Sequence, residues 1–129
     1  MARGTQLSVV VENKPGQLAK VCAALTRAKV NIDAVTVVDT AEAGIIRLVT
    51  SSNAKAKAAL KKAGMLVMQQ SVLVVKMANT PGALALAARK LAARGINIEY
   101  VYGSGAPKGQ LSTIVLGVSD IAKAEKVRL

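Results

Sequence analysis

The sequence lacks histidine, tryptophan and phenylalanine, and it has a single cysteine, Cys22, among 129 residues. One cysteine excludes an internal disulfide and a cysteine metal cluster. Without histidine, the usual zinc sites and histidine-dependent acid–base catalysis are excluded as well. The carboxylates of Asp33, Asp39 and Glu99 have no evident base or nucleophile as a partner. We therefore expect a protein that is not an enzyme, with no catalytic residues, no metal and no cofactor.

Long apolar runs are also absent. No run reaches the ~18 residues that a bilayer-spanning helix needs, and nothing before Leu7 resembles a signal peptide. Hydrophobic residues nevertheless make up 52% of the chain, which argues against disorder. We expect a folded, cytoplasmic protein without a membrane partner.

The chain does contain one motif, Asn-x-Pro-Gly-x-Leu, written twice. The first copy is Asn13-Lys14-Pro15-Gly16-Gln17-Leu18, and the second, 66 residues later, is Asn79-Thr80-Pro81-Gly82-Ala83-Leu84. Nine of the 23 positions 13–35 are identical to their counterparts at 79–101, and these include Asn31 and Asn97. Self-similarity at a fixed period indicates a duplicated structural unit. We place the two domains at residues 5–70 and 71–129.

Hydrophobic patterns predict the order strand, helix, strand, strand, helix, strand in the first copy. Its strands are expected at residues 7–11, 31–40, 45–50 and 65–70, with one helix after the motif and another capped by Asn53. The second copy predicts strands at 72–77, 96–102 and 111–118, and helices at 81–94 and from Ser119. The glycine-rich stretch 103–109 is expected to be a hairpin tip, because a strand follows it. The fold class is α+β, with two tandem ferredoxin-like units whose helices cover one face of an antiparallel sheet.

The second copy ends early. At the same offset, its fourth strand would begin at residue 131, beyond Leu129. We therefore predict a second unit that lacks its last strand and has a bare sheet edge, unless another segment or chain covers that edge. The run Val72 to Met77 is largely apolar on both faces, which predicts a protein partner on the open face and hence a homo-oligomer.

The motif lies between the first strand and the first helix of each copy. Proline suits the first helical turn, where its missing N–H costs nothing, and glycine permits a ligand to approach closely. Free N–H groups near Gly16 and Gly82, together with the positive end of the helix dipole, suit a carboxylate. Asn13 and Asn79 add an amide donor and a carbonyl acceptor, so that a zwitterion can be held. The alternative is an ordinary turn and helix cap, which the spacing alone favours.

The stretch from Val11 to Leu18, followed about a dozen residues later by Val30-Asn31-Ile32, resembles the ACT domain, the regulatory amino-acid-binding module of many biosynthetic enzymes. The resemblance implies that domains pair edge to edge through their second strands, bind a free amino acid at that interface, and act on a biosynthetic enzyme as a partner. The ligand-binding residues that it implies are Asn13, Lys14, Pro15, Gly16, Gln17, Leu18 and Asn31 in the first copy, and Asn79, Thr80, Pro81, Gly82, Ala83, Leu84 and Asn97 in the second.

This sequence departs from the family in two ways. Val11 and Met77 stand where the phosphoglycerate dehydrogenase branch has a histidine, so serine is not implied as the ligand. The loop residues also differ between the copies, with Lys14 against Thr80, so we expect unequal sites.

A net charge of +11, from 18 Lys+Arg against 7 Asp+Glu, supports an alternative function as a nucleic-acid-binding ferredoxin-like module. The only dense basic group is Lys55, Lys57, Lys61 and Lys62, for which we favour a solvated helix face. Tyr100 and Tyr102 are the only aromatic residues, and we favour packing over base stacking for them. A third hypothesis is a regulatory subunit that has lost its ligand and acts only as a dimerisation scaffold.

Overall fold

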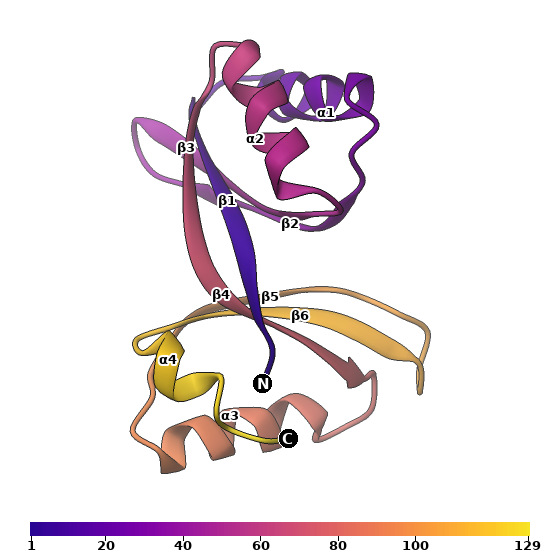
Figure 1. Cartoon of the computed structure of the whole chain (residues 1–129), viewed down its shortest axis with the longest axis vertical. Coiled ribbons are helices and arrows are strands. Elements are labelled where there is room, and N and C mark those ends of the chain that lie inside the picture. The colour runs from indigo at the N-terminus through magenta and orange to yellow at the C-terminus, as the bar shows by residue number, and fades with distance from the viewer. The chain divides into compact units, whose positions relative to one another are not determined.

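The computed structural model describes all residues from Met1 to Leu129 and has an α+β fold with six strands and four helices (Figure 1). The strands are hydrogen-bonded in the order β2-β3-β1-β4-β6-β5. The chain divides into two compact units, Gln6–Gln70 and Met1–Thr5 together with Ser71–Leu129. In chain order the elements are β1 (Arg3–Glu12), α1 (Gln17–Arg27), β2 (Ile32–Asp39), β3 (Ala43–Thr50), α2 (Asn53–Lys62), β4 (Leu66–Ala78), α3 (Ala83–Ala93), β5 (Ile98–Ser104), β6 (Leu111–Val118) and α4 (Ile121–Ala124).

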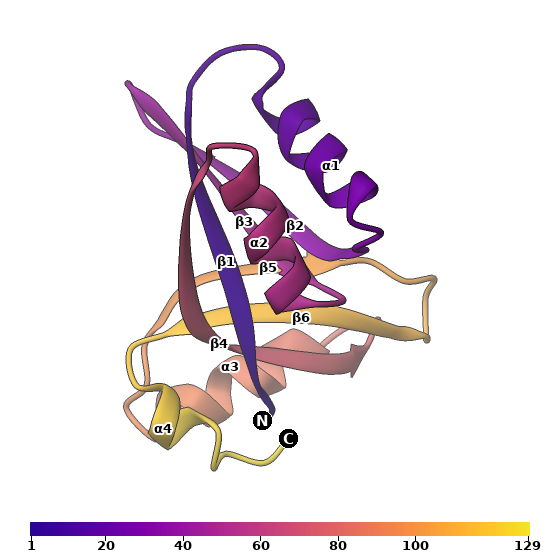
Figure 2. The ribbon, with the colours of Figure 1, turned by 45° about the horizontal axis from the view of Figure 1, so that its top comes forward.

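The unit Gln6–Gln70 folds from one continuous segment. β3 pairs antiparallel with both β1 and β2, so that Ile46 lies opposite Val9 on one side and Val37 on the other. α1 and α2 lie side by side and pack against one face of these strands (Figure 1, Figure 2). Their common core consists of Leu7, Val9, Val21, Ala24, Leu25, Val30, Ile46, Leu48, Ala56 and Leu60.

The two helices of this unit are amphipathic, as predicted. Val21, Ala24 and Leu25 are the buried residues of α1, a spacing that places them on one face of the helix. The predicted cap of α2 is wrong, because Asn53 is already its first helical residue. Ser52 precedes it with an extended backbone, and its hydroxyl accepts a hydrogen bond from the N–H of Lys55 at 3.4 Å. Serine is as effective a cap as asparagine, so Ser52 and Asn53 are both compatible with a cap at this point of the sequence.

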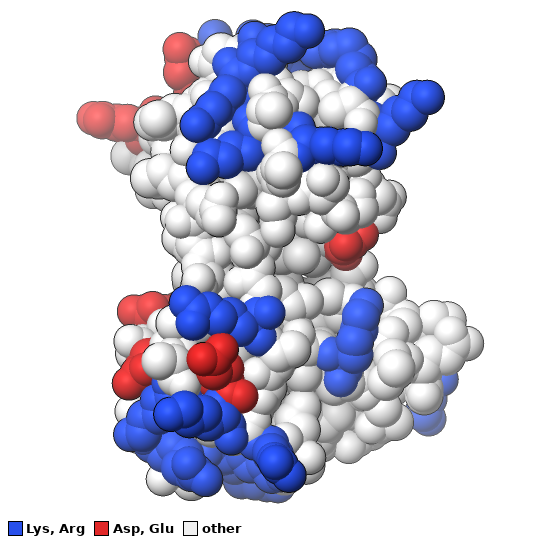
Figure 3. Space-filling model, viewed as in Figure 1, with Lys and Arg blue, Asp and Glu red and all other residues white.

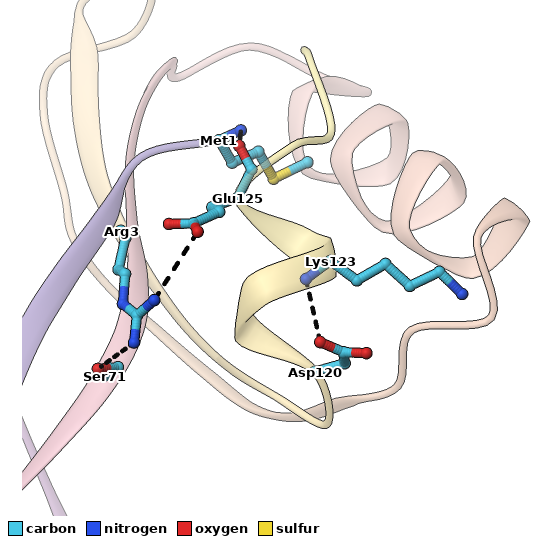
Figure 4. Close-up of polar contacts among 6 residues, drawn as sticks. All are labelled: Met1, Arg3, Ser71, Asp120, Lys123 and Glu125. Atoms are coloured by element: carbon cyan, nitrogen blue, oxygen red, sulfur yellow. Dashed lines mark hydrogen bonds and ion pairs between the residues drawn. The ribbon is translucent and has the colours of Figure 1, made fainter.

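The second unit builds a similar layer of helices on strands from residues 71–129. β6 pairs antiparallel with β4 and β5, and α3 and α4 pack against one face of them. α4 begins at Ile121 because the Asp120 carboxylate caps it, accepting a hydrogen bond from the N–H of Lys123 at 3.0 Å (Figure 4). The core consists of Leu73, Val75, Met77, Ala87, Leu91, Ile96, Leu116, Ala124 and Val127.

The start of the chain supplies the strand that the second repeat lacks. Residues 1–5 belong to the second unit, and the N–H of Val74 donates to the carbonyl of Ala2 at 2.9 Å. Gly4 allows this close approach, since a Cβ there would lie 2.5 Å from Cγ2 of Val74. The edge that was expected to be bare is therefore covered by β1, a pairing between residues too distant in sequence for periodicity to reveal.

Polar contacts hold this first segment in place (Figure 4). The Arg3 guanidinium lies 3.8 Å from the Glu125 carboxylate and donates to Oγ of Ser71 at 3.2 Å. The ammonium group of Met1 donates to the carbonyls of Glu125 and Val127, and the Met1 side chain packs against the second core. The segment thus contacts both β4 and the region after α4.

β4 is a single strand of 13 residues, whereas the sequence predicted two strands at 65–70 and 72–77. Its first part, up to Gln70, belongs to the unit Gln6–Gln70, and the part from Ser71 belongs to the other. No glycine or proline stands between Gln70 and Val72, so nothing in the backbone interrupts the strand. The repeat boundary therefore falls inside an element of secondary structure.

The predicted need for a partner on the open sheet face is not supported by the burial of this strand. Val72 and Leu73 are fully buried, and Val75 and Met77 are buried as well, within a single chain. Leu73, Val75 and Met77 lie on one face of the strand and need no second chain to cover them, whereas on the other face Val72 is buried, Val74 is half-buried and Lys76 is exposed. A homo-oligomer remains a prediction that rests on other features.

Candidate ligand-binding site

The first motif forms a sharp turn, which we call the first elbow (residues 13–18). Gly16 is the N-cap of α1 and has a left-handed backbone with φ of 90°. Its carbonyl accepts the first helical hydrogen bond, from the N–H of Lys20 at 3.1 Å. Pro15 therefore lies before the cap and outside the helix. The prediction that proline occupies the first helical turn is wrong, because the left-handed glycine separates it from the helix.

The second motif, the second elbow (residues 79–84), has the same geometry. Gly82 is the N-cap of α3 with φ of 88°, and its carbonyl accepts from the N–H of Leu86 at 3.0 Å. Pro81 again precedes the cap. The N–H of Ala83 is partly engaged, since it donates to the carbonyl of Thr80 at 3.3 Å. Two copies with different intervening residues reach one backbone conformation, which the shared Pro-Gly pair explains.

The helix starts at both elbows keep unpaired N–H groups. Neither Gly16 nor Gly82 has a side chain that can cap its helix, whereas α2 and α4 are capped by Ser52 and Asp120. The N–H groups that donate to no protein acceptor include those of Leu18, Ala19, Leu84 and Ala85. Unpaired donors at the positive end of a helix dipole attract an anion.

Space is available at both elbows. A Cβ built on Gly16 or Gly82 would meet no atom within 4 Å outside the adjoining residues, so the space beside each glycine is open. Leu18 and Leu84 occupy equivalent positions and are exposed to a similar degree, 42% and 43%. Each elbow thus offers backbone donors beside an exposed leucine.

The two elbow asparagines bind the neighbouring hairpin tips through their amide nitrogens. Nδ2 of Asn13 donates to Oδ1 of Asp39 at 2.7 Å and lies 3.5 Å from the carbonyl of Thr40. Nδ2 of Asn79 donates to the carbonyl of Ala106 at 2.7 Å. The side-chain oxygen of each asparagine remains available as an acceptor. The sequence did not indicate Asp39 as a partner of Asn13, because Asn13 follows β1 whereas Asp39 is the last residue of β2.

The second elbow is more firmly attached to its hairpin tip. The N–H of Asn79 donates to the carbonyl of Gln110 at 2.8 Å, and the N–H of Gly109 donates to the carbonyl of Asn79 at 2.9 Å. Residues 105–110 form this tip between β5 and β6, which confirms the predicted hairpin. No equivalent backbone pair holds Asn13. The two candidate sites therefore differ in the loop that lies beside the elbow.

Asn31 and Asn97 do not join the elbows within either unit. Each lies just before the second strand of its repeat, while Asn13 contacts Asp39 at the other end of β2. Their N–H groups donate to Ser51 and Ser119 hydroxyls at 2.9 Å and 3.0 Å. Nδ2 of Asn31 also donates to Asp33 at 2.8 Å. A site that combines an elbow with either asparagine requires a second domain.

The remaining predicted residues lie on the exposed side of the elbows. Lys14 forms an exposed ion pair with Glu12, with 3.2 Å between Nζ and Oε2. Thr80 is exposed, and Gln17 and Ala83 are the half-buried first residues of α1 and α3. Lys14 is thus the only charged side chain that the motif itself contributes.

The second strand of each repeat is an edge strand, because β2 is the first and β5 the last in the strand order. Both carry exposed apolar side chains, with Val35 at 41%, Val37 at 52% and Val101 at 45% exposure. Val35 and Val101 are equivalent positions in the two repeats. An exposed strand edge with apolar side chains is a template for pairing with another strand.

The profile of the family described as "ACT domain pair" matches residues 3–128, nearly the whole chain. This chain belongs to the ACT domain pairs. Its structure is similar to that of the protein BT0572 from Bacteroides thetaiotaomicron, with 33% identity, a TM-score of 0.87, and coverage of 95% of this chain and 83% of that one. No curated protein matches the chain.

Regulatory subunits of aspartate kinase have a similar fold. The ligand-free subunit from Thermus thermophilus has 16% identity and a TM-score of 0.66, with coverage of 98% of this chain and 94% of that one. The subunit from Thermus flavus has 20% identity and a TM-score of 0.59, with coverage of 96% and 90%. At these identities the likeness shows the shared fold. No helix of this chain has the length and apolarity to cross a membrane.

Proposed function

We propose that this ACT domain pair is a non-catalytic regulatory protein that binds a free amino acid at its elbows. The observation that carries the proposal is the pair of uncapped, unobstructed helix starts at Gly16 and Gly82. In this binding mode the ligand carboxylate accepts from the N–H groups of Leu18 and Ala19, or of Leu84 and Ala85. The ligand ammonium group donates to the side-chain oxygen of Asn13 or Asn79, whose amide nitrogen is already engaged.

The proposed site is completed by a second domain, which makes the protein a homo-oligomer. The exposed edges of β2 and β5 pair with second strands of another copy, and Asn31 or Asn97 is then brought to an elbow of the other domain. The exposed Val35 and Val101 support this pairing, because it would remove them from water. Ligand bound across such an interface favours the paired state by mass action.

The proposed regulatory role includes an enzyme partner. Two similar proteins are regulatory subunits of aspartate kinase, so this fold occurs in subunits that regulate an enzyme. In this chain, occupancy of the elbows would be passed to a biosynthetic enzyme through a change in assembly.

The test is a thermal-shift screen of the common amino acids, followed by alanine substitution of Asn13 and Asn31. A ligand at about 100 times its Kd stabilises the folded state by about 2.7 kcal/mol, which is measurable as a rise in Tm. Asn13→Ala and Asn31→Ala should each lower this rise, and adding Asn79→Ala and Asn97→Ala should remove what the second elbow contributes. Asn53→Ala is the matched control, since Asn53 lies at the start of α2 and outside both elbows. A screen in which no amino acid raises the Tm contradicts the proposal, and an intact dimer in that case favours a ligand-free scaffold.

A further inference from the structure

A groove between α1 and α2 has no role in the proposed amino-acid site. It has a volume of about 530 Å³ and lies on the unit Gln6–Gln70. Alanines, among them Ala24, Ala28 and Ala58, line it together with Arg27, Lys55 and Lys62. The elbow residues are not part of its lining. The groove is therefore a surface distinct from the elbows.

The charge around this groove is of one sign. Neither α1 nor α2 contains an acidic residue, while α2 alone carries four lysines. Lysine and arginine side chains gather over these two helices in Figure 3. The ion pairs Arg3–Glu125 and Lys14–Glu12 lie outside the groove, and Arg27, Lys55 and Lys62 form no ion pair with an acidic residue. Closely spaced cations without counter-charges produce a positive potential that attracts an acidic partner.

The residues that line the groove are not required by the fold, because the second repeat has different residues at two of the equivalent positions. The positions equivalent to Ala24 and Ala28 are Lys90 and Arg94. Nζ of Lys90 donates to the carbonyl of Arg128 at 2.8 Å and so lies across the corresponding face of α3. The second helix of that repeat, α4, has 4 residues, whereas α2 has 10. Alanine at positions 24 and 28, beside a helix with four lysines, is therefore found in the first repeat and not in the second.

The chemistry of the lining distinguishes between kinds of occupant. Single-stranded nucleic acid is bound by cations together with aromatic residues that stack on bases, and residues 6–70 contain no aromatic residue. A small molecule needs a few precisely placed polar groups, and here the only polar side chains are long, flexible cations. Alanines instead allow another backbone to approach closely, and a groove between two helices suits a third helix.

We propose that the groove between α1 and α2 docks an acidic amphipathic helix from a partner protein. Small apolar residues of that helix pack on Ala24, Ala28 and Ala58, while its flanking aspartates and glutamates pair with Arg27, Lys55 and Lys62. Charge complementarity increases the association rate, and the alanines of the lining determine which side chains can pack in the groove. This proposal does not depend on amino-acid binding, because none of these residues lies at an elbow.

The probe is an alanine-based peptide of about 20 residues, long enough to be helical, with glutamates flanking a stripe of alanines. Binding to the full chain is measured by fluorescence anisotropy, and the contact surface is mapped by amide chemical shifts. The double charge reversal Lys55→Glu with Lys62→Glu should weaken the peptide by about tenfold or more. The matched control, Arg89→Glu with Arg94→Glu, makes the same change in net charge on α3 and should alter affinity by less than about twofold.

One further variant separates shape from charge. Ala58→Lys adds a positive charge but places a long side chain in the lining of the groove, so it should weaken peptide binding, whereas simple charge attraction would strengthen it. The proposal is overturned if the peptide does not bind, if both double variants weaken it equally, or if Ala58→Lys strengthens it. It is also overturned, in favour of nucleic acid, if a uridine-rich RNA strand of equal charge binds more tightly and shifts the same amides. Circular dichroism of each variant verifies that it is folded.

Discussion

The first repeat supplies its own fourth strand, residues 66–70 of β4, whereas the second repeat takes residues 3–5 of β1. Both repeats otherwise follow the same order of strands and helices. The first can therefore complete its hydrogen bonds from a continuous segment, and the second depends on a segment from the other end of the chain. A duplicated sequence does not imply two equally independent domains.

The repeats also differ at one pair of facing residues on adjacent strands. In the first repeat Ala34 lies opposite Val49, and in the second Tyr100 lies opposite Gly117. A Cβ on Gly117 would lie 2.2 Å from Cζ of Tyr100. A small residue thus faces a larger one in both cases, with the sizes exchanged. Each repeat fills the same space in its own way, so substitutions are not transferable one at a time.

The largest effect should follow from deletion of residues 1–5. The deletion uncovers β4 and removes the contacts of Met1 and Arg3, and we expect the second unit to lose about 3 kcal/mol or more of its stability. Amide hydrogen exchange should show rapid exchange in β4, β5 and β6, with protection retained in β1 and β3. Equal loss of protection in both units would contradict the difference between the repeats.

A smaller effect is expected from Gly117→Val, which places a side chain against the Tyr100 ring. We expect a loss of about 3 kcal/mol in the free energy of unfolding, measured in urea, because the core there cannot expand freely. Adding Tyr100→Ala reproduces the pair of the first repeat. The double variant should be about 2 kcal/mol more stable than the sum of the single effects predicts. Simple additivity would show that the two positions are not coupled.

A third comparison concerns the residue that ends the first helix of each repeat. Lys29 has a left-handed backbone with φ of 57°, and Gly95 occupies the equivalent position with φ of 69°. Lys29→Gly should therefore stabilise the first unit by about 0.5–1 kcal/mol, while Gly95→Lys should destabilise the second by a similar amount. Urea midpoints of the two variants provide the measurement, and changes of the same sign would contradict this explanation.

The smallest effect is expected from Lys14→Thr, which gives the first elbow the residue of the second. The ion pair with Glu12 is exposed, so we expect the free energy of unfolding to change by less than about 0.5 kcal/mol. Asp39→Asn provides a contrasting variant at the same elbow, because it changes the side chain that accepts the hydrogen bond from Nδ2 of Asn13. A large effect of Lys14→Thr on stability would show that the exposed pair matters more than its exposure suggests.

Much of the fold follows from the sequence, because the motif and its period establish two repeats and the apolar pattern places the helices. The position of Pro15 could not be predicted, since the same Pro-Gly pair is compatible with proline inside or before the helix. The contact of Asn13 with Asp39 depends on strand pairing rather than on local pattern. Pairing of β4 with the start of the chain involves a segment that contains Arg3 and Gly4 and carries no strand pattern, so only the folded chain reveals it.

During synthesis, the β1 end of this arrangement emerges from the ribosome first. Residues 6–70 have all their partners once Gln70 has emerged, so this half can fold while translation continues. Residues 1–5, by contrast, can form their contacts only after β4 and the segment beyond α4 have been synthesised. Residues 1–5 are therefore synthesised before residues 6–70 but reach their native contacts after them.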